Sequence, residues 1–163
     1  MMRTVEGTHM AAGFRFAIVV SQYNDFVTER LQAGALAALA AAGVASDDVM
    51  VVHVPGAFEI PFAAQHVAET GRFDGIVCLG CVIRGATPHF EYIASAVANG
   101  LTAASAATGI PMAFGVLTTN SVEEAIERAG EGDGNKGREA ALAAVEMATV
   151  VAQLGAETQR KRK

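Results

Sequence analysis

Cysteine is scarce in this sequence of 163 residues, which contains Cys78 and Cys81 and no tryptophan. The two cysteines lie three positions apart in an apolar run that we predict to be a strand, so their side chains should point to opposite faces. They are then unable to form a disulfide with each other or to share a metal ion. No second pair of cysteines exists to complete a zinc site, and a thioredoxin-type motif belongs at a helix start. We therefore interpret both as small buried apolar residues.

Long apolar runs are also missing, although hydrophobic residues make up 52% of the chain. We find no stretch long and uninterrupted enough to predict a membrane-spanning helix, and residues 1–7 lack the apolar segment of a secretory signal. We therefore expect a cytoplasmic protein without membrane contact. The net charge of −5 argues against a nucleic-acid-binding protein. The chain ends in a basic run, and we interpret residues 155–163 as a solvated, disordered tail.

Short apolar runs alternate with helical patterns along the chain. Four of these runs are predominantly apolar, as is typical of strands in parallel sheets: residues 14–20 (apart from Arg15), 49–54, 74–83 and 112–117. The segments that follow them predict helices, and a short additional helix begins at a capping box formed by Ser121 and Glu124. This order predicts a flavodoxin-like three-layer α/β/α sandwich with a four-stranded parallel sheet. The domain spans residues 14–154, and residues 1–13 form an arm that is either disordered or docked on a neighbouring subunit.

The carboxyl ends of the four predicted strands should meet at one edge of the sheet, because parallel connections are right-handed. Four connecting segments then converge there: residues 21–24, 55–61, 84–90 and 114–121. The segment 84–90 combines a glycine turn with a helix start, which can offer backbone N–H groups and a positive helix end to an anion. These patterns predict an anion-binding edge, but they do not identify a reaction.

Each single candidate residue at this edge also has an ordinary structural explanation. Tyr23 either stacks on a planar heterocycle or packs on the next helix. Glu59 suits the positive end of a helix or accepts hydrogen bonds from a polyol, and His89 is either a solvated side chain or a proton shuttle. Arg128 either pairs with Glu124 four residues earlier or clamps a phosphate. The residues by themselves leave these alternatives open.

Several motifs, taken together and in order, resemble lumazine synthase, the penultimate enzyme of riboflavin biosynthesis. They are VPGAFEIP (54–61), GCVIRGATPHF (80–90), FGVLTT (114–119), ERAG (127–130) and NKG (135–137). The resemblance extends over about residues 14–154. It implies a transferase that condenses 5-amino-6-(D-ribitylamino)uracil with 3,4-dihydroxy-2-butanone 4-phosphate. The products would be 6,7-dimethyl-8-ribityllumazine, phosphate and water, with no cofactor and no metal required.

The resemblance also implies roles for individual residues. His89 and Arg128 would be catalytic, with His89 transferring protons and Arg128 clamping the phosphate in a neighbouring subunit's site. Tyr23 matches a position that stacks on the pyrimidine and is often phenylalanine or tryptophan in the family, and Glu59 would accept ribityl hydroxyls. The remaining matches are Ala57, Phe58, Cys81, Val82, Ile83 and Phe114 for the ribitylaminouracil, Gly85, Ala86 and Thr87 for the butanone phosphate, and Lys136 and Glu139 near the ribityl end.

The family resemblance further implies an assembly. Its members form pentamers with sites between subunits, and the segment before the first strand adds to the neighbour's sheet. The hinge at residues 130–137 lacks the insertion found in members that remain pentamers, so we expect a sixty-subunit shell, which could enclose riboflavin synthase. An inactive flavin- or lumazine-binding homologue and a purely structural cage are the alternatives. The presence of both His89 and Arg128 favours the enzyme.

Overall fold

The sheet has four parallel strands in the order β2-β1-β3-β4. The computed structural model describes residues 1–161, with side chains described for residues 1–159. The strands are β1 (Phe16–Ser21), β2 (Val49–Val54), β3 (Gly75–Ile83) and β4 (Met112–Thr119). Register is continuous across the sheet, and Val20 of β1 lies between His53 of β2 and Leu79 of β3.

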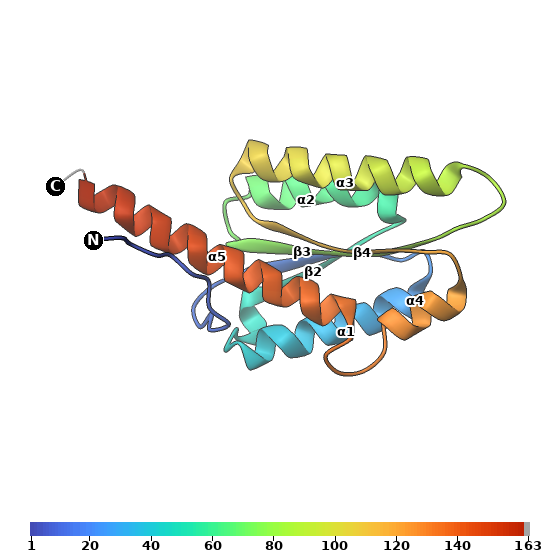
Figure 1. Cartoon of the computed structure of the whole chain (residues 1–163), viewed down its shortest axis with the longest axis horizontal. Coiled ribbons are helices and arrows are strands. Elements are labelled where there is room, and N and C mark those ends of the chain that lie inside the picture. The colour runs from blue at the N-terminus through green and yellow to red at the C-terminus, as the bar shows by residue number, and fades with distance from the viewer. Residues whose placement is uncertain (162–163) are drawn as a thin grey trace.

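Helices cover both faces of this sheet (Figure 1). On one face lie α2 (Ile60–Glu69) and α3 (His89–Thr108), and on the other lie α1 (Asp25–Ala41), α4 (Val122–Arg128) and α5 (Lys136–Lys161). Two short 3₁₀ turns, η1 (Ser46–Asp48) and η2 (Ala57–Glu59), flank β2. The predicted α/β/α sandwich is therefore confirmed.

Alternating side chains of each strand build two separate cores. Val77, Leu79 and Cys81 of β3 face α1 and α5, whereas Ile76 and Cys78 face α2 and α3. The two cysteines are free and buried on opposite sides of the sheet, as the strand period requires. Burial raises the pKa of Cys78 to about 12 and that of Cys81 to about 11. Both thiols therefore stay protonated at neutral pH.

One strand is less buried than its apolar sequence predicts. We expected β2 to be covered on both faces, but His53 is exposed and Met50 keeps 37% of its surface accessible. The reason is position, because β2 is an edge strand paired with β1 alone in the described chain. The sequence of an edge strand can match that of a central one, since burial depends on its neighbours.

The helix α5 continues well beyond Leu154 and reaches Lys161, so the disordered tail predicted from residue 155 is wrong as far as the structure describes it. No proline ends the helix, and the arm of residues 1–13 lies along it (Figure 1). Gln153 Nε2 donates to Glu6 O at 2.7 Å, and Arg3 pairs with Glu157. Residues 162–163 lie outside the described chain.

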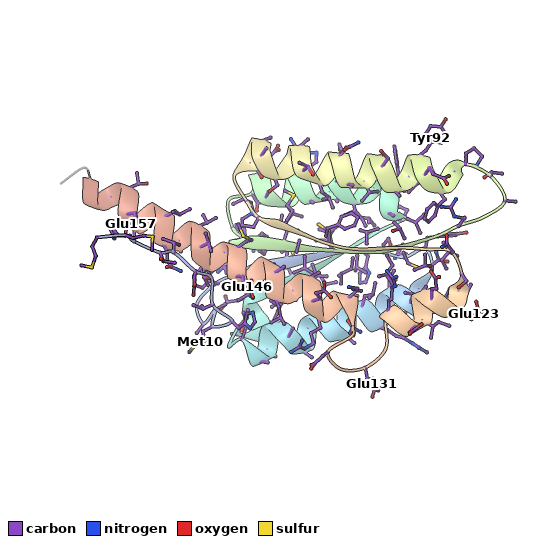
Figure 2. All side chains as sticks on the ribbon, viewed as in Figure 1. Met10, Tyr92, Glu123, Glu131, Glu146 and Glu157 are labelled. Carbon is purple, nitrogen blue, oxygen red and sulfur yellow. The ribbon has the colours of Figure 1, made fainter. Side chains whose placement is uncertain are left out.

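The arm makes its contacts with its own subunit. Thr8 N donates to Thr149 Oγ1 at 3.0 Å, and His9 pairs with Glu146, which lies on α5 in Figure 2. Ala11 is fully buried and donates its N–H to Ala42 O at 2.8 Å. Docking of this arm on a neighbouring subunit stays a prediction about the assembled protein.

Within the helical segment Lys136–Gln159, an 18-residue window reaches a mean hydropathy of 1.3, and the segment has the length of a membrane-spanning helix, which we did not expect from the sequence. The face of this helix that is turned toward the sheet packs into the hydrophobic core. Ala141 and Val145 are fully buried against the sheet, while Glu146 and Glu157 lie in the part that runs along the arm. A packed alanine-rich helix and a membrane span share this composition, so packing separates them here.

Candidate active site at the carboxyl edge of the sheet

A cleft of about 570 Å³ opens at the carboxyl ends of β1 and β3. Figure 1 shows these strand ends at the end of the molecule opposite the two termini. The volume of the cleft suits a small-molecule ligand. Its walls come from the β1–α1 turn, the η2 segment, the end of β3 and the β3–α3 connection. The lining residues are Tyr23, Asn24, Gly56, Ala57, Phe58, Glu59, Cys81, Val82, Ile83, Gly85, Thr87, His89, Phe90 and Ile93. Three of the four segments predicted to meet at this edge therefore converge on the cleft, whereas no residue of 114–121 lines it.

The β1–α1 turn is fixed by an unusual asparagine. Asn24 has a φ of 63°, a left-handed conformation that asparagine tolerates better than most residues. It directly precedes α1, but its side chain makes no capping bond. Its Nδ2 instead donates to Cys81 O at 3.0 Å, which ties the turn to β3. This arrangement leaves Tyr23 73% exposed on the cleft wall.

Glu59 ends the short 3₁₀ turn that leads into α2. Its side chain is half-buried, and its carboxylate accepts no hydrogen bond from the described residues. Pro61 occupies the first turn of α2, where its missing N–H has no consequence. Phe58, beside it, is 61% exposed. The turn therefore presents a free carboxylate and an aromatic ring to the cleft.

His89 is the first residue of α3, directly after the exposed turn of residues 85–88. Pro88 precedes the helix and supplies no side-chain cap, so the first N–H groups of α3 remain available. Together with the positive end of the helix dipole, these groups favour an anion. An imidazole beside a bound anion can exchange protons with it or with its reaction partner.

The family model for 6,7-dimethyl-8-ribityllumazine synthase matches residues 13–152. The chain belongs to this family. The resemblance seen in the sequence motifs is confirmed, and the match includes nearly all of the predicted domain. Membership implies a soluble biosynthetic transferase of riboflavin biosynthesis, with small-molecule substrates and a homo-oligomeric assembly.

Four residues implied by the lumazine synthase resemblance lie away from the cleft of this subunit. Phe114, 49% exposed, lines a separate shallow cavity against α3. Arg128 is exposed at the end of α4, and Lys136 Nζ pairs with Glu139 Oε2 at 2.9 Å at the start of α5. Ala86 belongs to the cleft-forming turn, although it is not among the lining residues. One subunit therefore brings together Tyr23, the 57–59 segment, the end of β3 and His89. Phe114, Arg128, Lys136 and Glu139 do not line this cleft.

The ordinary explanation for Arg128 fails in the structure. Glu124, its expected partner, accepts a hydrogen bond from Asn120 N at 3.0 Å. Its backbone N–H donates to Ser121 Oγ at 3.2 Å, so the predicted capping box forms, with the glutamate reaching one residue further back. Arg128 makes no ion pair or side-chain hydrogen bond with the described residues, and its guanidinium is free to bind a ligand.

Asn135 is the residue whose importance sequence reasoning missed. It is buried, and its Nδ2 lies within hydrogen-bond distance of Arg30 O, Ala129 O and Gly130 O at 3.0–3.2 Å. Its Oδ1 accepts from Arg138 N at 3.0 Å. A Cβ on Gly34 would lie only 2.2 Å from Asn135 Oδ1, so helix α1 must carry glycine at this point. The NKG motif (135–137) included this asparagine in the family resemblance but gave it no role, because an asparagine among glycines also suits an ordinary loop.

A larger cavity, of about 850 Å³, lies between α1, the 129–135 loop and α5. Alanine is the most frequent residue in its wall, and Arg30, Glu131 and Arg138 supply its charges. It contains none of the side chains implied by the family resemblance. The smaller cleft is therefore the candidate active site. It is chosen for the side chains that line it, which match the family resemblance, and not for its volume.

Proposed function

We propose that this protein is a 6,7-dimethyl-8-ribityllumazine synthase that condenses 5-amino-6-(D-ribitylamino)uracil with 3,4-dihydroxy-2-butanone 4-phosphate. The observation that carries the proposal is the convergence of three groups on one cleft: the exposed ring of Tyr23, the free carboxylate of Glu59 and the imidazole of His89. A flat heterocycle, a polyol chain and a phosphate need these three kinds of contact.

The pyrimidine substrate would bind along the wall made by the β1–α1 turn and η2. Its ring stacks on Tyr23, whose hydroxyl should not disturb the stacking, and its ribityl hydroxyls donate to Glu59. The Cys81–Ile83 segment contacts the ring through its backbone. The thiol of Cys81 takes no part as a nucleophile, because burial holds its pKa at about 11 and its side chain points into the other core.

The phosphate of the second substrate would bind at the 85–87 turn and the start of α3. The amine of the pyrimidine attacks the ketone carbonyl, and loss of water gives an imine. His89, next to both the turn and the cleft, accepts and returns protons during imine formation and phosphate release. Phosphate leaves, and closure and dehydration of the ring give the product. Much of the acceleration comes from holding the two reactants together.

Arg128 and Phe114 would complete the site of a neighbouring subunit. Support comes from their exposure and from the free guanidinium of Arg128, which has a planar fork suited to phosphate. Lys136 and Glu139 would approach the ribityl end in the same way. We infer a cytoplasmic pentamer and, from the short 130–137 hinge, a sixty-subunit shell that could enclose riboflavin synthase. Light scattering that detects only pentamer-sized particles across buffers would exclude the shell.

The decisive experiment is incubation of the purified protein with both substrates while the fluorescent product is followed. Product formation that requires both substrates, and that is strongly reduced in Arg128→Ala, supports the enzyme. Tight binding of the pyrimidine or of a flavin without any product identifies the binding homologue instead. Assembly without either binding or turnover identifies a structural cage.

A further inference from the structure

Arg84 connects three elements at the mouth of the cleft. It directly follows β3, and its backbone N–H donates to Thr119 O of β4 at 2.8 Å. Its Nε donates to Asn120 Oδ1 at 2.9 Å, and its Nη1 forms an ion pair with Glu91 in the first turn of α3. The same guanidinium lies over the ring of Phe90, 4.5 Å from its centroid.

These contacts bridge the base of the turn that would hold the phosphate. Residues 85–88 are all exposed, and no described backbone hydrogen bond fixes the N–H groups of residues 85–87. The turn is therefore held mainly at its two ends. Arg84 is at one end. At the other end its side chain stacks on the ring of Phe90 and forms an ion pair with Glu91, and His89 directly precedes these two residues in the chain.

We propose that Arg84 is a positioning residue, which fixes the 85–88 turn and the first turn of α3 in the geometry that binds the phosphate and aims His89. The inference rests on the proposed function. Free N–H groups bind an anion well only if they already point at it, and a misplacement of about 1 Å can cost roughly a hundredfold in rate. The bridge supplies this order without occupying the N–H groups themselves.

A different role for Arg84, as a direct ligand of the phosphate, is less consistent with the contacts. Arg84 is not among the residues that line the cleft, and both Nε and Nη1 are already engaged. Glu91 neutralises its charge, and the hydrogen bond from Arg84 lowers the pKa of Glu91, so the carboxylate is ionised at neutral pH. The two roles predict opposite effects of removing Glu91.

The test is steady-state kinetics of Arg84→Gln, Glu91→Gln and the double variant, with each substrate varied in turn. If Arg84 acts through the bridge, each single variant raises KM for the butanone phosphate on the order of tenfold and leaves KM for the pyrimidine unchanged. The double variant is then no worse than either single one, because both remove the same bridge. A fall in KM for the butanone phosphate with Glu91→Gln, or additive losses, would overturn the proposal.

Arg72→Gln is the matched control, because Arg72 also lies over an aromatic ring, that of Phe73, 5.7 Å from its centroid and outside the cleft. It should leave both KM values unchanged. Calorimetric titration with inorganic phosphate gives a second readout that needs no turnover. Weaker binding in Arg84→Gln and Glu91→Gln, but not in Arg72→Gln, supports positioning; equal binding in all of them contradicts it. If the unsubstituted protein forms no product but this pattern persists, the proposed function fails and the positioning role stands.

Discussion

Two connections in this molecule lead into long helices, and they differ in how their backbone polar groups are paired. The β3–α3 turn at residues 85–88 and the α4–α5 loop at residues 129–135 both contain glycine and both lead into a long helix. In the first, the backbone N–H groups are free, and a surface bridge from Arg84 holds the ends. In the second, the buried Nδ2 of Asn135 lies within hydrogen-bond distance of three carbonyl groups, and its Oδ1 caps α5.

The difference shows which connection is suited to a ligand and which to support. A turn whose polar groups remain unpaired is costly unless water or a ligand satisfies them, and at 85–88 they are open to the cleft. A loop whose polar groups are paired internally is rigid and suited to holding flanking residues. The 129–135 loop separates Arg128 from Lys136, so the contacts of Asn135 fix the backbone that connects these two residues.

The largest expected effect comes from removing the side-chain amide of Asn135, which tests whether its contacts support the 129–135 loop. Asn135→Ala leaves buried carbonyl groups without donors, and we expect a loss of about 3 kcal/mol in the free energy of unfolding. Urea denaturation measures it. Asn99→Ala, at an exposed position on α3, is the control and should change stability by less than about 0.5 kcal/mol. Equal effects of the two substitutions would show that the Asn135 network is not a structural support.

The next prediction concerns the two proposed catalytic residues. Arg128→Ala removes charge-assisted contacts to phosphate, and we expect kcat/KM to fall about a hundredfold. His89→Ala should cost less, about tenfold, if approximation of the reactants supplies most of the rate. Kinetics of both variants at matched assembly state decide the order. An inactive His89→Ala enzyme beside an active Arg128→Ala enzyme would reverse the proposed division of roles.

A third prediction separates the pyrimidine wall of the cleft from the phosphate turn. Glu59→Gln weakens the acceptor for the ribityl hydroxyls, so KM for the pyrimidine should rise about tenfold while KM for the butanone phosphate stays constant. Tyr23→Phe keeps the ring and should change neither value by more than about twofold. If Tyr23→Phe were as damaging as Glu59→Gln, the hydroxyl and not the ring face would be the functional group.

The smallest predicted effect is a pH dependence of stability at the surface bridge. Because Arg84 lowers the folded-state pKa of Glu91 below its unfolded value of 4.5, the bridge stabilises the fold above that pH. This contribution is lost as the pH falls through the folded-state pKa. The difference in urea midpoint between the wild-type protein and Glu91→Gln should therefore shrink on acidification. An unchanged difference would mean that the ion pair contributes nothing measurable.

Much of the fold was predictable from local patterns. Short, predominantly apolar runs located all four strands, and Ser121 with Glu124 located α4, because these signals arise from neighbours in the chain. Errors appeared where burial or support depends on distant elements. The apolar sequence of β2 did not reveal an edge strand, and the basic end of the chain did not reveal the arm that packs along α5.

For the site, the sequence determined which residue types follow each strand, and the motifs at residues 54–61 and 80–90 determined the family. Only the tertiary structure decided that Asn24 ties its turn to Cys81, that Arg84 bridges to Glu91, and that Asn135 organises the second loop. Such contacts depend on side-chain directions set by the packing of the whole sheet. A sequence pattern records residue types and spacing, whereas these bonds require groups from different elements to meet within about 3 Å.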